Sequence, residues 1–177
     1  MANIYPYQNQ WPAISEQSFV ADHVVITGNV SIAEDANIWF NTVIRGDVSP
    51  TIIEKKVNIQ DQCTLHQSPN LPLHLEEGVS VGHQCLLHSC TVKKNALIGM
   101  GSIVLDGAEI GEGALIGAGS LIPKGKKIPP KTLAFGRPAK VIRDLNEADL
   151  DEMKRIREQY VMRGKEYKET MKQQSHK

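Results

Sequence analysis

Three histidines stand close together near the middle of the 177-residue chain. His83 and His88 lie five residues apart in the segment VGHQCLLH, and His66 closes the segment CTLH. Imidazole nitrogens bind Zn²⁺ and exchange protons near neutral pH. Two side chains five residues apart do not share a face on a helix, and they do not share one on a strand. The chemistry therefore depends on the structural repeat that carries these residues.

A six-residue repeat runs through most of the chain. An aliphatic residue recurs at every sixth position from Val92 to Ile122, and the same register holds upstream from Ile26 to Ile44. Two positions before most of these aliphatics stands a smaller residue, as Cys90 stands before Val92. The pattern predicts a triangular solenoid whose short strands direct both residues inward. Three strands complete one coil, and the coils stack about 4.8 Å apart.

The repeat is interrupted at three places. The interrupted intervals are nine residues from Ile44 to Ile53, ten from Leu65 to Leu75, and five from Leu87 to Val92. Insertions into a solenoid form loops on one edge, which is often the binding edge. We therefore expect the functional residues to lie near these interruptions.

The chain divides into four predicted segments. They are a lead-in over residues 1–20, the solenoid over 21–125, a proline-rich connector over 126–145, and an amphipathic helix over 146–177. Asn146 and Asp149 form a plausible cap for that helix. Its apolar stripe consists of Leu150, Met153, Ile156, Tyr160 and Tyr167, which predicts that the helix packs back along the solenoid.

The phase of the repeat predicts which of these side chains meet. His66 and His88 each follow an inward leucine and are separated by one full coil, so they should be neighbours on one column. Arg45 falls on the same column one coil earlier. His83 lies beyond a corner and should point elsewhere within one chain. A three-fold ring of identical subunits would complete a set of three histidines at each interface. Three imidazoles with one open position are typical of catalytic Zn²⁺.

The chain resembles the gamma-class carbonic anhydrase-like proteins. The matching segments are VIRGDV (43–48), NIQD (58–61), LH (65–66) and VGHQCLLH (81–88), and the GRPAK connector and final helix fit as well. The resemblance implies an all-β solenoid, a left-handed parallel β-helix of hexapeptide repeats with a C-terminal α-helix, assembled as a homotrimer. It also implies a lyase, a carbonate dehydratase that hydrates CO₂ to bicarbonate with a metal-bound hydroxide at the trimer interface.

The same resemblance implies a metal site shared between subunits. His66 and His88 would bind the metal from one subunit, and His83 would bind it from the next. Zn²⁺ is the expected metal, with Fe²⁺ or Co²⁺ as alternatives. Arg45 and Asp47 match a family ion pair at the interface that helps to order the site.

Three further residues and one loop match less completely. Gln60 would hydrogen-bond the metal-bound hydroxide, and Asn58 would orient Gln60. Tyr160 on the last helix is a candidate for closing the pocket. The best-known family members carry a proton-shuttling glutamate in the loop after the first ligand, whereas residues 67–74 contain no acid. His74 could replace it or be an ordinary loop histidine, so we expect turnover to be low.

Composition narrows the range of functions. Twenty Lys and Arg residues balance twenty Asp and Glu residues, so no basic field favours binding to nucleic acid or a membrane. The first residues lack the pattern of a secretory signal and no apolar run reaches transmembrane length, so we expect a cytoplasmic protein. Cys63, Cys85 and Cys90 all occupy the small inward position and are interpreted as core residues.

Two other functions remain open from the sequence. A hexapeptide-repeat acyltransferase using coenzyme A would need one histidine base and no metal. A catalytically weak metal-binding scaffold would keep the same histidines, because fold does not determine function. The set of three histidines with Arg45, Asp47 and Gln60 favours the metalloenzyme over the acyltransferase.

Overall fold

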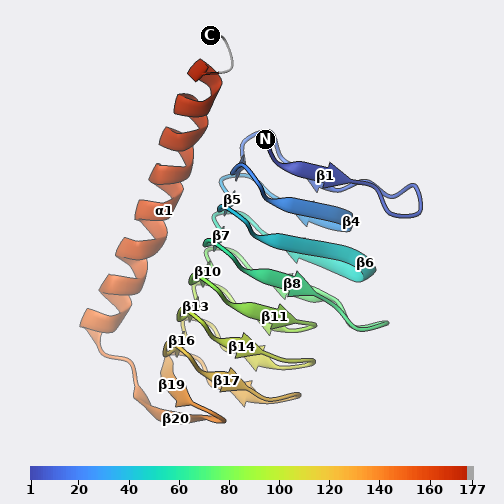
Figure 1. Ribbon diagram of the computed structural model, residues 1–177. Coiled ribbons are helices and arrows are strands. Elements are labelled where there is room, and N and C mark those ends of the chain that lie inside the picture. The colour runs from blue at the N-terminus through green and yellow to red at the C-terminus, as the bar shows by residue number, and fades with distance from the viewer. Residues whose placement is uncertain (175–177) are drawn as a thin grey trace.

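The chain folds into a triangular prism of stacked coils. The computed structural model describes residues 1–174. Most strands are two or three residues long, and they pair in parallel, coil on coil (Figure 1). Within these residues one helix, α1 (Glu147–Gln174), follows the last strands. This is the left-handed parallel β-helix with a C-terminal helix that the sequence predicts, although residues 175–177 of the predicted helix lie outside the described part.

Three sheet faces form the prism, and the two long strands β4 (Val25–Ile32) and β6 (Val43–Ile53) run across a corner from the second face to the third. The first face contains β3 (Phe19–Val20), β5 (Asn37–Ile38), β7 (Asn58–Ile59), β10 (Ser80–Val81), β13 (Leu97–Ile98), β16 (Leu115–Ile116), β19 (Thr132–Gly136) and β20 (Ala139–Asp144). The second contains β1 (Asn3–Tyr5), β8 (Thr64–His66), β11 (Leu86–His88), β14 (Ile103–Val104) and β17 (Leu121–Ile122). The third contains β2 (Ala13–Ile14), β9 (Leu73–Leu75), β12 (Thr91–Val92), β15 (Glu109–Ile110) and β18 (Lys127–Ile128).

The predicted inward aliphatics form the core. Along the second face they are successive cross-strand partners with no exposed surface, namely Ile44, Leu65, Leu87, Val104 and Ile122. Burying such side chains contributes about 1.5–3 kcal/mol each relative to leaving them exposed. The six-residue repeat therefore supplies one inward aliphatic to each face on every coil, and these residues stack into one column per face.

The cysteines belong to this core, as their phase predicts. Cys63, Cys85 and Cys90 are free and at most 1% exposed. Burial raises the pKa of the Cys90 thiol to about 12. A thiol that stays protonated at neutral pH is a poor metal ligand or nucleophile. These cysteines fill space between aliphatic columns.

The corner between the first and second faces depends on one left-handed residue per coil. This residue stands three positions before the inward aliphatic and has a φ near +60°, as in Asn41, Gln62, Gln84, Gly101 and Gly119. Gly101 adopts this conformation at no steric cost, whereas other residues resist it by roughly 1–2 kcal/mol. His83 immediately precedes Gln84, so the turn places it on this corner.

All three interruptions of the repeat fall at the corner between the second and third faces. The first lies inside β6, which crosses the corner as one continuous strand. The second is the loop of residues 67–72, closed by an antiparallel bridge between Ser68 and Leu71. The third is the short connection from His88 to Thr91. Figure 1 shows this edge of the prism on the side away from α1.

Helix α1 packs along the first face, against β3, β5 and β7. Its start carries a reciprocal cap in which the Asp149 N–H donates to Asn146 Oδ1 and the Asn146 N–H donates to Asp149 Oδ2, both at 2.9 Å. Farther along, buried Gly164 lets the helix approach the sheet, because a Cβ there would lie 3.0 Å from that of Asn37. The described residues include no helix with the length and apolar composition needed to span a membrane.

Candidate metal centre

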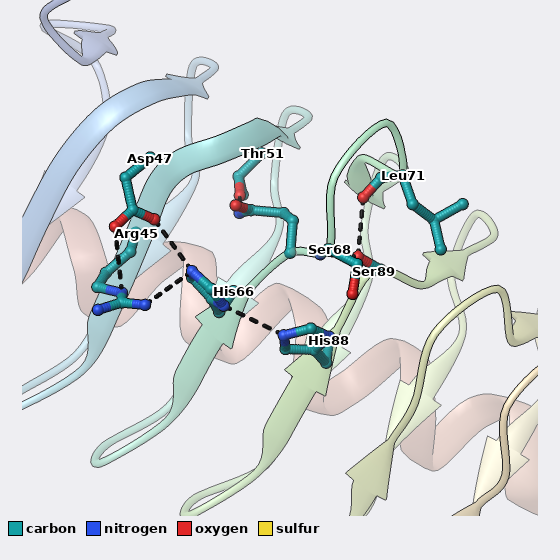
Figure 2. Close-up of polar contacts among 9 residues, drawn as sticks. Arg45, Asp47, Thr51, His66, Ser68, Leu71, His88 and Ser89 are labelled. Carbon is teal, nitrogen blue, oxygen red and sulfur yellow. Dashed lines mark hydrogen bonds and ion pairs between the residues drawn. The ribbon is translucent and has the colours of Figure 1, made fainter. Parts of the chain in front are cut away.

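His66 and His88 face each other on the outer side of the second face. They are direct cross-strand partners in β8 and β11. The Nδ1 of His66 lies 3.1 Å from the Nε2 of His88 (Figure 2). Their side chains are 21% and 28% exposed, so the pair is sheltered but open to one side. Two ring nitrogens thus converge on one point.

Each imidazole of this pair also contacts an aspartate through its other nitrogen. The Nε2 of His66 lies 3.0 Å from Asp47 Oδ1, and the Nδ1 of His88 lies 2.5 Å from Asp106 Oδ1. Where the carboxylate accepts a ring N–H, the proton is held on the outer nitrogen. The inner nitrogens then carry the lone pairs.

Arg45 adds a second partner for His66. Its Nη2 lies 2.8 Å from His66 Nε2, and its Nε lies 3.7 Å from Asp47 Oδ2 (Figure 2). One imidazole nitrogen cannot accept a hydrogen bond from Arg45 and donate one to Asp47 at the same time. Two arrangements are therefore available. In one, Nε2–H donates to Asp47 and both inner nitrogens are free; in the other, Arg45 donates to Nε2 and Nδ1–H donates to His88.

His83 is held apart from this pair. It lies in the turn after β10, where its Nδ1 is 2.8 Å from Asp61 Oδ2. Within the described residues of one chain, no three His, Cys, Asp or Glu side chains form a group that could hold a metal ion. The corner therefore separates His83 from His66 and His88, as the five-residue spacing predicts.

Gln60 and Asn58 form a buried hydrogen-bond chain on the first face. The Gln60 Nε2 donates to Asn58 Oδ1 at 3.2 Å, and the Asn58 Nδ2 donates to Ser80 Oγ at 2.7 Å. Gln60 is 5% exposed and Asn58 is fully buried. The contact by which Asn58 would orient Gln60 is thus present, and Gln60 directly precedes Asp61, the partner of His83.

Tyr160 belongs to an aromatic cluster between α1 and the first face. Its ring lies edge-on to that of Trp39, with 5.5 Å between centroids, and Arg163 lies 5.8 Å over the ring. Burial raises the pKa of the Tyr160 hydroxyl, and the Asp61 carboxylate raises it further. Tyr160 therefore lies on the side of the prism that carries His83.

His74 lies in β9 on the third face. Its Nε2 is 2.8 Å from Glu54 Oε1. The strands β8 and β9 pair with opposite ends of β6, so His66 and His74 sit on different faces. His74 is an imidazole paired with a carboxylate outside the His66–His88 pair.

Sequence reasoning missed Asp61, Asp106 and Ser68. The repeat phase could have found Asp61, because it stands two residues after Ile59, as His83 stands two after Val81, and those strands are paired. Asp106 was harder to find because it stands two residues after Val104, whereas its partner His88 stands one residue after Leu87 on the preceding coil. The Ser68 hydroxyl donates to Asp106 Oδ2 at 2.7 Å. That hydrogen bond, followed by the His88 contact, lowers the pKa of Asp106 and keeps it ionised.

Comparisons with known proteins support one family. Residues 89–124 match the family described as "Bacterial transferase hexapeptide (six repeats)". A protein of Geobacillus kaustophilus named carbonic anhydrase is 64% identical over 97% of this chain and 94% of its own length. The Bacillus subtilis protein YtoA, named an uncharacterized transferase, is 61% identical over 93% and 96%. A crystal structure of a Bacillus cereus protein matches with a TM-score of 0.95 and 67% identity, covering 96% of this chain and 98% of that one.

Proposed function

We propose that this chain, which belongs to the hexapeptide-repeat family of gamma-class carbonic anhydrase-like proteins, binds a divalent metal between subunits of a homotrimer and interconverts CO₂ and bicarbonate there. The main support is the pair of facing nitrogens on His66 and His88, each imidazole backed by an aspartate. An acyltransferase base would need only one such histidine.

The donor set fits a divalent metal. When Asp47 and Asp106 hold the outer ring protons, two lone pairs face each other across 3.1 Å, which favours a cation between them. Two imidazole nitrogens bound to one tetrahedral Zn²⁺ at about 2.0–2.1 Å lie roughly 3.3 Å apart. The carboxylate–histidine arrangement is also the usual support for a metal ligand.

A third ligand from a second subunit would complete the site. His83 has its own aspartate, Asp61, yet lies across a corner from the pair. A heterologous contact repeated around a three-fold axis would bring His83 of one copy to His66 and His88 of the next. Each subunit would then serve two sites, with its histidine pair on one side and His83 on the other.

The outer surface of the second face suits such a contact. Its outward residues are cross-strand partners that form one column, which we call the outer aliphatic column: Val25, Val43, Thr64, Leu86, Ile103 and Leu121. Leu86 is 38% exposed and projects to the same side as His88, two residues along β11. The matching column of the third face holds Ser31, Ile52, His74, Thr91, Glu109 and Lys127. The apolar face is the better subunit interface.

The chain's own residues would then direct the chemistry. A divalent metal at this point supplies an acidified water, with a pKa lowered towards neutrality. Asp47, Asp61 and Asp106 would each accept the proton of an outer ring nitrogen, so that the lone pair of the other nitrogen is directed to the metal. Gln60, fixed by Asn58 and next to Asp61 in the chain, would offer a rigid amide on the His83 side of the shared site. Because residues 67–72 contain no carboxylate, a proton released at the site would pass to solvent or buffer, and turnover should rise with imidazole buffer concentration.

The function is tested by measuring CO₂ hydration on protein loaded separately with Zn²⁺ and with Fe²⁺ under anaerobic conditions. We expect activity with at least one metal, its loss in the His66→Ala variant, and no acetyl transfer from acetyl-coenzyme A to amine acceptors. Stoichiometric metal binding without CO₂ hydration would favour the scaffold. Acetyl transfer by metal-free protein would favour the acyltransferase.

A further inference from the structure

Asp106 lies one coil beyond His88 and contacts it closely. Asp106 stands two residues after the end of β14, the strand paired with β11. Its Oδ1 lies 2.5 Å from His88 Nδ1, and its Oδ2 accepts the hydrogen bond from Ser68 Oγ at 2.7 Å. Both carboxylate oxygens are therefore engaged, one by the imidazole and one by the loop of residues 67–72. The carboxylate cannot rotate without breaking one of these contacts.

The loop of residues 67–72 is tied to the coil that carries His88. The Ser68 N–H donates to Ser89 Oγ at 2.6 Å, and the Ser89 hydroxyl donates to the Leu71 carbonyl at 2.8 Å (Figure 2). Gln67 is 1% exposed and hydrogen-bonds Thr51 of β6. Because the loop begins directly after His66, its contacts join four coils: that of Thr51, that of His66, that of His88 and that of Asp106.

We propose that Asp106 and Ser68 are positioning residues for His88, through which the order of the 67–72 loop is coupled to metal affinity; this rests on the proposed metal site. Asp106 holds the His88 proton on Nδ1 and leaves Nε2 free to face His66. Ser68 fixes the Asp106 carboxylate by donating to its second oxygen. Metal binding and loop closure then stabilise the same hydrogen-bond chain, so each should strengthen the other.

This arrangement differs from that of the other histidine of the pair. Asp47, the partner of His66, has its second oxygen near Arg45 of the same strand, at 3.7 Å. Asp106 instead depends on a loop that interrupts the repeat. Loosening the loop should therefore affect His88 more than His66, and this asymmetry is measurable.

The test uses four variants of the full-length protein. Asp106→Ala and the isosteric Asp106→Asn act on the carboxylate, and Ser68→Ala acts on the loop. Glu54→Gln is the matched control, because Glu54 also contacts an imidazole, that of His74, at 2.8 Å but on the third face. Circular dichroism identifies the variants that keep the β-helix, and trimer content is measured in parallel.

The first readout is Zn²⁺ affinity, measured by competition with a chromophoric chelator. We expect Asp106→Ala to weaken binding by about 10–100-fold, the range for lost carboxylate partners of metal ligands. Ser68→Ala should weaken it less, and Glu54→Gln should match the wild type. Wild-type affinity in folded Asp106→Ala and Asp106→Asn would overturn the positioning role.

The second readout separates positioning from general stability. ¹⁵N NMR of the histidine rings should show His88 protonated on Nδ1 in the wild type and a mixture of tautomers in Asp106→Ala. Amide exchange over residues 67–72 should slow when Zn²⁺ binds the wild type, and this slowing should be lost in Ser68→Ala. Equal slowing of amide exchange in the wild type and in Ser68→Ala would contradict the coupling between loop order and metal binding. If the wild type bound no Zn²⁺ through His66, the proposed metal site itself would be wrong. If it bound Zn²⁺ but the Asp106 and Ser68 variants behaved like the wild type, only the positioning role would be wrong.

Discussion

At the scale of single residues, an imidazole becomes a metal ligand only when one nitrogen is kept free of its proton. His66, His83 and His88 each have an aspartate near one nitrogen, at 3.0, 2.8 and 2.5 Å. A carboxylate that accepts the ring proton leaves the other nitrogen with a lone pair, and for His66 this is the arrangement in which Nε2–H donates to Asp47. The proposed metal site therefore consists of histidine–aspartate pairs rather than histidines alone.

Removing the aspartate behind His83 should weaken metal binding without harming the fold. Asp61 is 35% exposed in its side chain, so Asp61→Ala leaves no large cavity. We expect Zn²⁺ affinity to fall by about 10–100-fold, because the His83 tautomer is no longer fixed. Chelator competition on purified trimers measures this change. Glu54→Ala, which removes the carboxylate beside His74, serves as control and should bind Zn²⁺ normally; equal losses in both variants would contradict a specific role for Asp61.

At the scale of elements, two parts of the chain differ in regularity. The corner between the second and third faces is irregular, whereas α1 is a regular capped helix. The corner departs from the six-residue repeat three times, and Arg45, Asp47, His66 and His88 all lie there. Helix α1 begins with a regular cap and covers the first face. The corner at which the repeat is interrupted thus carries the histidine pair with Arg45 and Asp47, and the helix covers the first face.

The cap of α1 should make the stability of the protein depend on pH. Hydrogen bonds from Arg143 and then from the Asn146 N–H lower the pKa of Asp149 to about 2, from a usual value of 3.8. Because the folded pKa is depressed, the ionised cap stabilises the helix fully above the usual value. This stabilisation is lost as the pH falls through about 2.

Asp149→Asn should therefore lower the urea midpoint for unfolding at pH 7, and its difference from the wild type should shrink between pH 4 and pH 2. Urea titrations followed by circular dichroism at several pH values measure this. The control is Glu169→Gln, an exposed change on the same helix far from the cap. A wild-type advantage that persisted unchanged at pH 2 would show that the charge of Asp149 does not act as proposed.

At the scale of the whole molecule, a single prism would present only half of each proposed metal site. The second face carries the outer aliphatic column beside His66 and His88, while His83 lies on the adjoining corner. One copy can bury that column only against another copy or another partner. Three-fold closure would cover the column and complete the ligand set at the same contact.

A charge placed in the outer aliphatic column should separate the subunits. Leu86→Glu would place a carboxylate in the proposed interface, and we expect monomers by analytical ultracentrifugation together with loss of stoichiometric Zn²⁺. Ile52→Glu is the matched control, because Ile52 is also an outward aliphatic, 37% exposed against 38% for Leu86, but lies on the third face. If trimers persisted in Leu86→Glu but dissociated in Ile52→Glu, the interface would lie on the third face and the proposed assignment would be wrong.

The sequence predicts most of the fold because one physical rule repeats on every coil. Leu65 and Leu87 are identified as inward by their phase, and the pairing of His66 with His88 follows from that. The cap of Asn146 with Asp149 is equally local. Asp106 and Ser68 could not be found this way, because their contact crosses the corner where the repeat loses its phase. The proposed partners of His83 in another subunit lie outside any single-chain rule.

The central claim is that metal sites are shared between copies, and complementation tests it most directly. His83→Ala keeps the His66–His88 pair, and the double variant His66→Ala/His88→Ala keeps His83. The two chains are coexpressed with different tags, and mixed trimers are isolated by two affinity steps. Each homotrimer should bind no Zn²⁺ tightly, whereas mixed trimers should regain a high-affinity site. Mixed trimers that bound no more Zn²⁺ than their parents, or His83→Ala homotrimers that bound it normally, would contradict the shared site.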